Sequence, residues 1–180
     1  LENINSYYIE HSLVIGVNKE KCTQNLNGEN ILITLQFTED HTPEENKKLL
    51  EDLQLFIQEN SNHQFVLKHH PRFNNEINNE EMLKHANVSI TQKPLAECLR
   101  NCKIHSTAYS TTVFEAAALK VPSVFYSDWK IEIYKNQFIY PINTLNDTLR
   151  MYNDLQVEVE NWYKNYYEPL NETLWLKIVQ

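Results

Sequence analysis

Two short stretches of the sequence concentrate side chains that can bind an anion. Residues 69–72 read HHPR and follow an apolar run, and residues 105–112 read HSTAYSTT and precede a second one. An imidazole N–H donates well to a phosphate oxygen, a guanidinium binds it in a bidentate way, and hydroxyls add further donors. Phosphate binding is therefore the chemistry that these stretches predict. The candidate residues are His70, Pro71, Arg72, Ser106, Thr107, Ser110, Thr111 and Thr112.

The proline of the first stretch has a structural consequence. Pro71 cannot donate to a sheet and restricts the residue before it, so His70 is expected at the very end of a strand. A solvated surface turn would show the same residues, and the sequence leaves that interpretation open. Two adjacent histidines also suggest a metal. Neighbours at a strand end point to opposite sides, however, and no carboxylate partner is evident, so we predict no metal site.

The second stretch is predicted to start a helix over residues 113–119. With Thr112 as its N-cap, Glu115 occupies the third helical position, and T-x-x-E is the pattern of a capping box. A strand that delivers hydroxyls to a helix N-terminus also suits an anion, because the first N–H groups of a helix lack partners inside it. In this functional interpretation Glu115 binds the hydroxyls of a ribose. Both roles are compatible, since the carboxylate has two oxygens.

Glycine usage and motif spacing exclude several other sites. The chain has only two glycines, so neither a Walker loop nor a G-x-G-x-x-G fingerprint is present. A Ser–His hydrolase is disfavoured because the G-x-S-x-G elbow is missing, although His70 and His105 both lie near serines. Cys22, Cys98 and Cys102 complete no zinc set, and we predict reduced, buried thiols.

The overall composition narrows the class of protein. The chain has 180 residues, of which 42% are apolar and 22% charged, and this suits a folded domain with a sizeable core. Its net charge of -8 argues against a nucleic-acid partner. No run approaches the roughly 20 apolar residues of a membrane span, and no secretion signal is visible. We therefore expect a cytoplasmic protein, with peripheral association at the inner face of the cell membrane as an open alternative.

The elements that would position the two stretches alternate along the chain. Strand-length apolar runs and helical segments follow one another with short connections, which is typical of a doubly wound α/β domain. Thr42, Pro43 and Glu45 combine an N-cap, an N1 proline and a capping box at one helix start. Ligands in such sheets bind beyond the carboxyl ends of the strands, and this adds Gln36 as a candidate. The predicted strands are residues 31–37, 64–68, 87–91, 103–107 and 122–126, with 12–17 and 138–141 as further candidates; the predicted helices are residues 42–60, 80–85, 94–101, 113–119, 143–152, 158–167 and 172–179.

The two stretches, in this order and at this spacing, resemble a known family. A strand followed by HP, then S-T-x-x-x-E-A-A-x-x-x-x-P and another strand, is similar to the C-terminal, donor-binding half of GT-B glycosyltransferases. The likeness is greatest to bacterial sialyltransferases and polysialyltransferases and to capsule Kdo and CDP-glycerol transferases. It covers roughly residues 31–149, and its specificity lies in KHHPR and YSTTVFEAAALKVPSV.

The resemblance implies a fold and a set of roles. The fold would be a Rossmann-like, three-layer domain with a mainly parallel sheet of five to six strands, one half of a GT-B enzyme. His70 would contact the phosphate or cytidine end of the donor, Ser110 and Thr111 would bind phosphate, and Glu115 would lie near the ribose. Neighbours of the phosphate would be Lys68 and Arg72.

One position departs from the family pattern. Families of this type usually have Gly two residues before the proline, where this chain has Lys120. A residue just past a helix end often needs a positive φ, which costs a non-glycine residue roughly 1 kcal/mol. The sequence therefore predicts a different turn at Lys120.

The resemblance also implies an activity and a missing part. The enzyme would transfer a sugar from a nucleotide donor, best matched by a CMP-sugar such as sialic acid or Kdo, to a saccharide hydroxyl in surface-polysaccharide synthesis. A CDP-glycerol-type glycerophosphotransferase and a UDP-sugar enzyme are alternatives, and a non-catalytic α/β module that binds a nucleotide or a partner is the alternative from another class. The family's catalytic base lies in an N-terminal acceptor domain that these 180 residues do not show, so the chain alone is expected to be inactive and its catalytic residues stay unassigned.

These expectations divide the chain into three parts. Residues 1–30 are predicted to be an entry segment or linker, and residues 31–152 the nucleotide-sugar-binding domain. Residues 153–180 are predicted to form C-terminal helices that pack on this domain or on the missing half. No bound cofactor is expected besides the nucleotide-sugar substrate.

Overall fold

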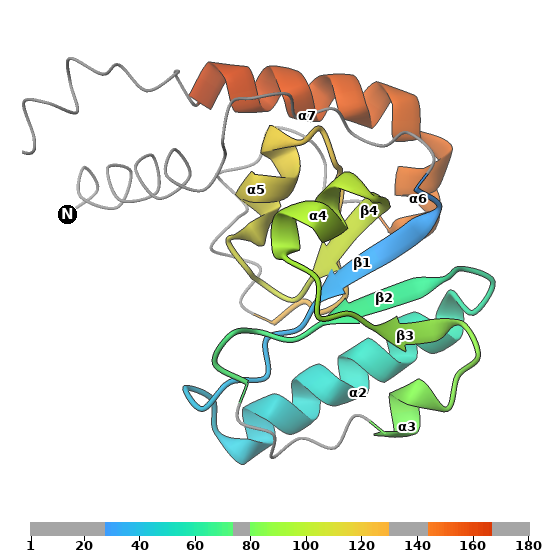
Figure 1. The fold of residues 1–180 in the computed structure, drawn as a ribbon, viewed down its shortest axis with the longest axis vertical. Helices are drawn as coiled ribbons and strands as arrows, with labels where there is room; N and C mark the ends of the chain where they lie inside the picture. The colour runs from blue at the N-terminus through green and yellow to red at the C-terminus, as the bar shows by residue number, and fades with distance from the viewer. Residues whose placement is uncertain (1–27, 74–79, 130–143, 167–180) are drawn as a thin grey trace, which may run out of the picture.

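The computed structural model describes residues 28–73, 80–129 and 144–166. Within these ranges five strands form one parallel sheet in the order β3-β2-β1-β4-β5 (Figure 1). This arrangement confirms the predicted α/β, Rossmann-like class. The strands are β1 (Asn30–Thr34), β2 (Phe65–Lys68), β3 (Val88–Ile90), β4 (Cys102–Thr107) and β5 (Ser123–Phe125); the helices are α2 (Pro43–Glu59), α3 (Glu80–Leu83), α4 (Leu95–Arg100), α5 (Thr112–Ala118), α6 (Leu145–Arg150) and α7 (Tyr152–Tyr166).

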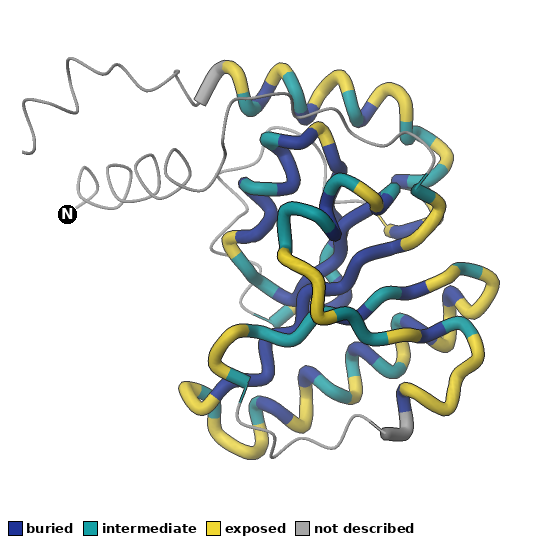
Figure 2. Tube along the Cα trace, viewed as in Figure 1, coloured by how far each residue is buried: buried dark blue, intermediate teal, exposed yellow. Residues whose placement is uncertain are grey.

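Helices cover both faces of the sheet, and the alternation of side chains along β1 shows how. Ile31 and Ile33 belong to a core cluster with Leu49 and Leu53 of α2. Leu32, which points the other way, belongs to a cluster formed with α4 and α5. Figure 1 shows α2 and α3 on one side of β2 and β3, with α4, α5 and α7 on the other. The chain is most buried along β1, β4 and α5 (Figure 2). A central strand apolar on both faces is what a parallel sheet requires.

Most predicted elements are present, several of them with different bounds. The strand predicted over residues 31–37 ends at Thr34, although Leu35 and Phe37 remain buried. The helix predicted over residues 42–60 is confirmed as α2, and its capping box is formed: Thr42 Oγ1 accepts from the Glu45 N–H at 3.2 Å, and Glu45 Oε2 accepts from the Thr42 N–H at 2.9 Å. The segments predicted over residues 143–152 and 158–167 correspond to α6 and one long α7. Predicted elements at residues 12–17, 138–141 and 172–179 lie outside the described residues.

Helix α7 packs on α5 and so belongs to the same folded unit as the sheet. Phe114 of α5 stacks on Trp162 of α7 with ring centroids 5.8 Å apart, and Val113, Leu155 and Val159 complete this cluster. The long aromatic helix is therefore tied to the helix that follows the HSTAYSTT loop. No helix in the described part of the chain is long and apolar enough to cross a membrane.

The turn at Lys120 corrects the sequence-based expectation. Lys120 adopts a positive φ of 61°. Its N–H donates to the Ala117 carbonyl at 2.9 Å and the Val121 N–H donates to the Ala116 carbonyl at 2.9 Å, which together form a Schellman motif. A turn of the type that glycine usually occupies is thus formed by a lysine. Lys120 also makes an ion pair with Glu160 of α7 at 2.9 Å.

We expect the free energy of unfolding of Lys120→Gly to be about 1 kcal/mol higher than that of Lys120→Ala. Only alanine keeps the Cβ that disfavours this backbone conformation. Both variants lack the ion pair to Glu160, so their difference isolates the backbone term. Urea unfolding of the two variants measures it. Equal midpoints and slopes would contradict a strained turn at this position.

Candidate functional site

The candidate site lies where the strand order reverses. β1 stands between β2 and β4, so the loop after β1 is flanked by the HHPR loop after β2 and by the HSTAYSTT loop after β4. The carboxyl ends of parallel strands share one edge of a sheet, and ligands of doubly wound domains bind at that reversal. The fold therefore brings together the two stretches that the sequence singled out.

Gln36 organises the loop after β4 from inside. Its Oε1 accepts the Tyr109 N–H at 2.7 Å and lies 3.2 Å from the Thr107 hydroxyl. Thr107 Oγ1 in turn accepts the Ser110 N–H at 3.4 Å. Gln36 is only 7% exposed, so its amide oxygen serves the loop rather than a ligand. We assign Gln36 as a positioning residue of this loop.

The start of α5 differs from the predicted capping box. The helix begins at Thr112, its N-cap is Thr111, and no side chain caps it. Ser110 Oγ instead accepts the Thr112 N–H at 3.2 Å and lies 2.7 Å from Thr112 Oγ1. The prediction of Thr112 as N-cap and Glu115 as its partner is wrong. The hydroxyl of Ser110, two residues upstream, accepts the Thr112 N–H, and serine side chains in turns commonly bond a backbone N–H two residues on.

This helix start offers fewer free amides than the sequence suggested. The Val113 N–H donates to the Ser110 carbonyl at 3.4 Å, and the Phe114 N–H donates to the Thr111 carbonyl at 2.9 Å. Among the described residues, the Thr111 N–H has no acceptor in this loop. Thr111 is exposed and Ser110 is half-buried. An anion here would meet the Thr111 N–H and nearby hydroxyls.

His70 is held in one tautomer at the end of β2. Its Nδ1 accepts the Arg72 N–H at 3.1 Å, so the hydrogen of the neutral ring is on Nε2, which can donate to an anionic oxygen. Burial lowers the pKa of His70 below its ordinary value, and the positive charge of Arg72 adds to this, while Asp40 opposes it. His70 is therefore a neutral donor at physiological pH.

The two cations predicted beside the phosphate have protein partners. Arg72 pairs with Asp40 at 2.6 Å, with both side chains about half exposed, and Pro71 forms the exposed turn before it. Lys68 Nζ donates to the Lys93 carbonyl at 2.7 Å, toward the loop after β3. Exposed ion pairs contribute about 0–1 kcal/mol, so Arg72 can exchange Asp40 for a ligand at little cost.

Three predicted residues lie in less accessible places. Ser106 and Thr107 are fully buried, and Ser106 Oγ has no hydrogen-bond partner among the residues that the structure describes. These two hydroxyls lie within the core in this conformation. Glu115 is half-buried, no described residue pairs with its carboxylate, and burial raises its pKa above the ordinary value.

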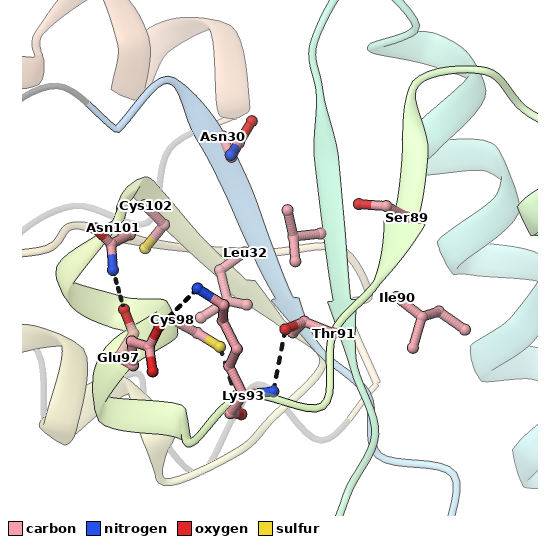
Figure 3. A pocket seen from close by; sticks show the side chains of 11 residues that line it. Asn30, Leu32, Ser89, Ile90, Thr91, Lys93, Glu97, Cys98, Asn101 and Cys102 are labelled. Carbon is pink, nitrogen blue, oxygen red and sulfur yellow. Dashed lines mark hydrogen bonds and ion pairs between the residues drawn. The ribbon is translucent and has the colours of Figure 1, made fainter.

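Two cavities lie elsewhere in the fold. One of about 290 Å³ lies between α4 and the face of β1, β2 and β3, with Leu32, Cys98 and Cys102 in its lining and the Lys93–Glu97 ion pair at its rim (Figure 3). The other, of about 530 Å³, lies between α2, the end of β5 and α6. Neither of these two cavities is lined by the HHPR or HSTAYSTT loop.

The structure adds aromatic residues that the sequence did not select. Tyr109 hydrogen-bonds to His41, and the Trp129 ring lies edge-on to both, with centroids 5.2 Å from His41 and 5.3 Å from Tyr109. Each follows the end of a strand: β1, β4 and β5. That position was a usable signal, but the sequence patterns assigned none of the three a role.

Comparisons with known proteins find likeness in structure only. No family model and no curated protein matches the sequence. The wall teichoic acid polymerase TagF, as an H444N variant, is 16% identical, with a TM-score of 0.56 over 98% of this chain and 46% of that one. TarM is 17% identical, with a TM-score of 0.53 over 91% of this chain and 37% of that one. The glycosyltransferase SnogD from Streptomyces nogalater is 16% identical, with a TM-score of 0.52 over 92% of this chain and 47% of that one.

The chain thus spans less than half the length of these enzymes. At such identities the likeness concerns the fold, and it agrees with the sheet order and flanking helices described above. The protein has the α/β, Rossmann-like architecture that occurs in GT-B glycosyltransferases.

Proposed function

We propose that this chain is the donor-binding domain of a glycosyltransferase that builds a bacterial surface polysaccharide. It holds the nucleotide of an activated donor while the donor's sugar passes to a saccharide hydroxyl. The observation that carries the proposal is the convergence of the HHPR and HSTAYSTT loops at the strand-order reversal of a fold found in TagF, TarM and SnogD. The base that activates the acceptor belongs, in this proposal, to a further acceptor domain.

The proposed roles follow from the geometry of the two loops. His70 donates its Nε2–H to a phosphate oxygen, since Nδ1 is occupied by the Arg72 N–H. The Thr111 N–H and the Ser110 and Thr111 hydroxyls add donors from the opposite side of β1. Glu115 is suited to ribose hydroxyls because no described residue pairs with its carboxylate. Catalysis then comes from positioning the donor and stabilising the leaving phosphate.

The donor we propose first is a CMP-sugar, such as one of sialic acid or Kdo, because the HP and S-T motifs resemble those families. A CDP-glycerol-type transferase is the second candidate, and the likeness to a teichoic acid polymerase supports it. Both reactions release CMP, since each breaks the bond between the transferred group and a cytidine monophosphate. CMP is therefore the shared ligand to test.

Calorimetric titration with CMP, CDP and UDP tests the proposal. We expect CMP and CDP to bind more tightly than UDP. Preference for UDP would exclude the cytidine donors and leave a UDP-sugar enzyme. Absence of binding by all three at millimolar concentration would exclude a donor site and leave a partner-binding module.

Replacing His70 tests the residue at the centre of the site. His70→Ala is expected to weaken CMP binding by about 10- to 100-fold, because it removes a hydrogen bond to a charged group worth about 1.5–3 kcal/mol. The matched control is His85→Ala, which changes an exposed histidine away from both loops. Unchanged affinity in His70→Ala, with the fold intact by circular dichroism, would show that His70 does not contact the nucleotide.

A further inference from the structure

A chain of polar side chains beside the candidate site has no role in the proposal above. Tyr109 hydrogen-bonds to His41 Nε2, His41 Nδ1 lies 3.2 Å from Asn46 Oδ1, and the Asn46 amide nitrogen donates to the Thr38 carbonyl at 3.2 Å. Asn46 is buried in the first turns of α2. These contacts connect a rigid helix to the loop that carries Ser110.

The hydrogen positions in this chain follow from its fixed end. The Asn46 amide nitrogen faces a carbonyl, so Asn46 Oδ1 faces His41 and must accept. His41 Nδ1 therefore carries a hydrogen, and Nε2 of the neutral ring accepts from the Tyr109 hydroxyl. Burial, the largest cause, and the charges of Glu45 and Asp40 raise the pKa of Tyr109 to about 12, with Arg72 opposing. The Tyr109 phenol therefore stays protonated and donates its hydrogen to His41 Nε2.

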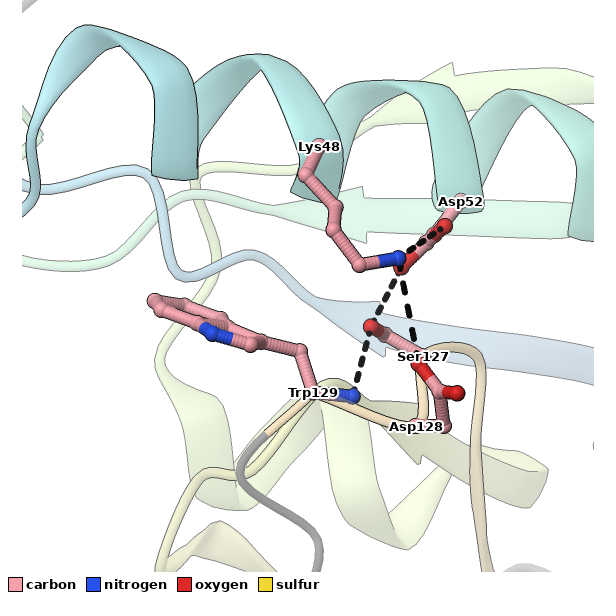
Figure 4. Close-up of polar contacts among 5 residues, drawn as sticks. All are labelled: Lys48, Asp52, Ser127, Asp128 and Trp129. Atoms are coloured by element: carbon pink, nitrogen blue, oxygen red, sulfur yellow. Dashed lines mark hydrogen bonds and ion pairs between the residues drawn. The ribbon is translucent and has the colours of Figure 1, made fainter.

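The ring of Trp129 packs against the His41–Tyr109 pair, and the loop that carries Trp129 is itself held in place by hydrogen bonds. The Trp129 ring packs edge-on against His41 and Tyr109, and the Trp129 backbone N–H donates to Ser127 Oγ at 3.1 Å. Ser127 in turn donates to Asp52 of α2 at 2.5 Å (Figure 4). The loop after β5 is thereby held against the same helix that holds His41, so the pair is shielded and preorganised.

His41 and Tyr109 are each next to a residue of the proposed phosphate site or its ion pair. Asp40, the residue before His41, pairs with Arg72 at 2.6 Å, and the charges of Asp40 and Arg72 also affect the pKa values of His70 and Tyr109. Tyr109 immediately precedes Ser110 in the loop. The hydroxyl of Tyr109 and the Nε2–H of His70 therefore belong to one electrostatic neighbourhood, with loops from β1, β2 and β4 contributing to it.

We propose that Asn46, His41 and Tyr109 form a proton relay that couples binding of the donor's phosphate to the uptake of one proton. This inference rests on the proposed function. When a phosphate occupies the site, Tyr109 turns its hydrogen toward a phosphate oxygen. His41 Nε2 then takes up one proton that the buffer acid releases to the solvent, and the new Nε2–H donates to the Tyr109 oxygen. No bond between heavy atoms changes, and the imidazolium compensates part of the phosphate charge.

The contacts favour His41 over His70 as the proton acceptor. Protonated His41 has an acceptor for each N–H, Asn46 Oδ1 and the Tyr109 oxygen. Protonated His70 would lose the bond that its Nδ1 accepts from the Arg72 N–H. Protonated His41 thus keeps both of its hydrogen bonds, whereas protonated His70 loses one, and this makes His41 the better partner for an arriving anion.

Calorimetry in two buffers of different ionisation enthalpy measures the relay. CMP binding to the full chain at pH 7.5 is expected to take up a proton, and His41→Gln is expected to abolish that uptake. Tyr109→Phe, which keeps the ring, is expected to abolish the uptake and to weaken CMP binding about tenfold. His70→Ala is expected to weaken binding but to keep the uptake. His85→Gln serves as the matched control and is expected to change neither.

A second measurement needs no variant to fold. The ¹³Cε1 and ¹Hε1 resonances of His41 in the wild-type chain are expected to move to imidazolium positions when CMP saturates it. CMP binding with neutral His41 resonances, or with equal proton uptake in wild type and His41→Gln, overturns the relay and leaves the proposed function standing. Absence of CMP, CDP and UDP binding overturns both.

Discussion

Acidification from pH 6.5 to pH 4.5 is expected to remove about 3 kcal/mol from the free energy of unfolding through one residue, His105. Its ring lies in the centre of the sheet and is fully buried. Its two nitrogens are 2.9 Å from Thr34 Oγ1 on β1 and 2.9 Å from Ser123 Oγ on β5, so it joins three strands. No charged partner accompanies it in these contacts.

The sign of the effect follows from the pKa. Burial lowers the pKa of His105 from its ordinary 6.5 to about 3. The unfolded chain therefore binds a proton below pH 6.5, whereas the folded chain does so only near pH 3. Stability is fully present above pH 6.5 and is lost as the pH falls through this window, by about 1.4 kcal/mol per unit. Glu115, whose pKa is raised, acts in the opposite direction, but it is half-exposed and its effect is smaller.

Urea unfolding at pH 6.5, 5.5 and 4.5 measures this dependence. His105→Gln is expected to flatten it, and His85→Gln, in which an exposed histidine is replaced, is expected to leave it unchanged. If His105→Gln does not fold, the histidine resonances of the wild type decide: His105 is expected to stay neutral at pH 4.5. An imidazolium signal from His105 at that pH would contradict the buried neutral state.

Replacement of Gln36 is expected to damage both stability and nucleotide binding. Gln36→Met keeps the side-chain volume but removes the oxygen that accepts the Tyr109 N–H and the Thr107 hydroxyl. The Thr107 hydroxyl keeps the Thr34 carbonyl as its acceptor at 3.2 Å, but the Tyr109 N–H loses its acceptor, and a donor left without a partner costs about 1–3 kcal/mol. We expect a loss of about 1–3 kcal/mol in the free energy of unfolding and at least tenfold weaker CMP binding, because the loop that carries Ser110 loses its anchor.

A matched pair separates the two effects. Leu53→Met changes a buried residue of α2 with similar volume and no polar contact, and is expected to cost less than about 1.5 kcal/mol without affecting CMP affinity. Chemical unfolding and CMP titration of both variants give the comparison. Wild-type affinity in Gln36→Met would show that the loop holds its conformation without this oxygen.

Local sequence rules predicted some features correctly, and for physical reasons. The apolar run of β1 and the T-P-x-E start of α2 depend on residues within a few positions of one another, and both are confirmed. The start of α5 shows where such rules fail. Ser110, Thr111 and Thr112 are all residues that commonly cap helices, so local rules cannot choose among them. In the structure the Ser110 hydroxyl accepts the Thr112 N–H. Likewise, Lys120 retains a glycine-type turn because two backbone hydrogen bonds and an ion pair to α7 hold it.

The sequence by itself determined the α/β class, the parallel sheet and the two loops at its carboxyl edge. Apolar periodicity, prolines and caps are short-range signals, and they sufficed for these. Only the tertiary structure decided which side chains within the loops are free to contact a ligand and which are engaged by other parts of the protein. Gln36 bonds Tyr109, His41 bonds Tyr109, and His105 bonds Thr34 across more than 65 positions of sequence. Such partners are chosen by the strand order, because the reversal at β1 sets loops that are distant in sequence side by side.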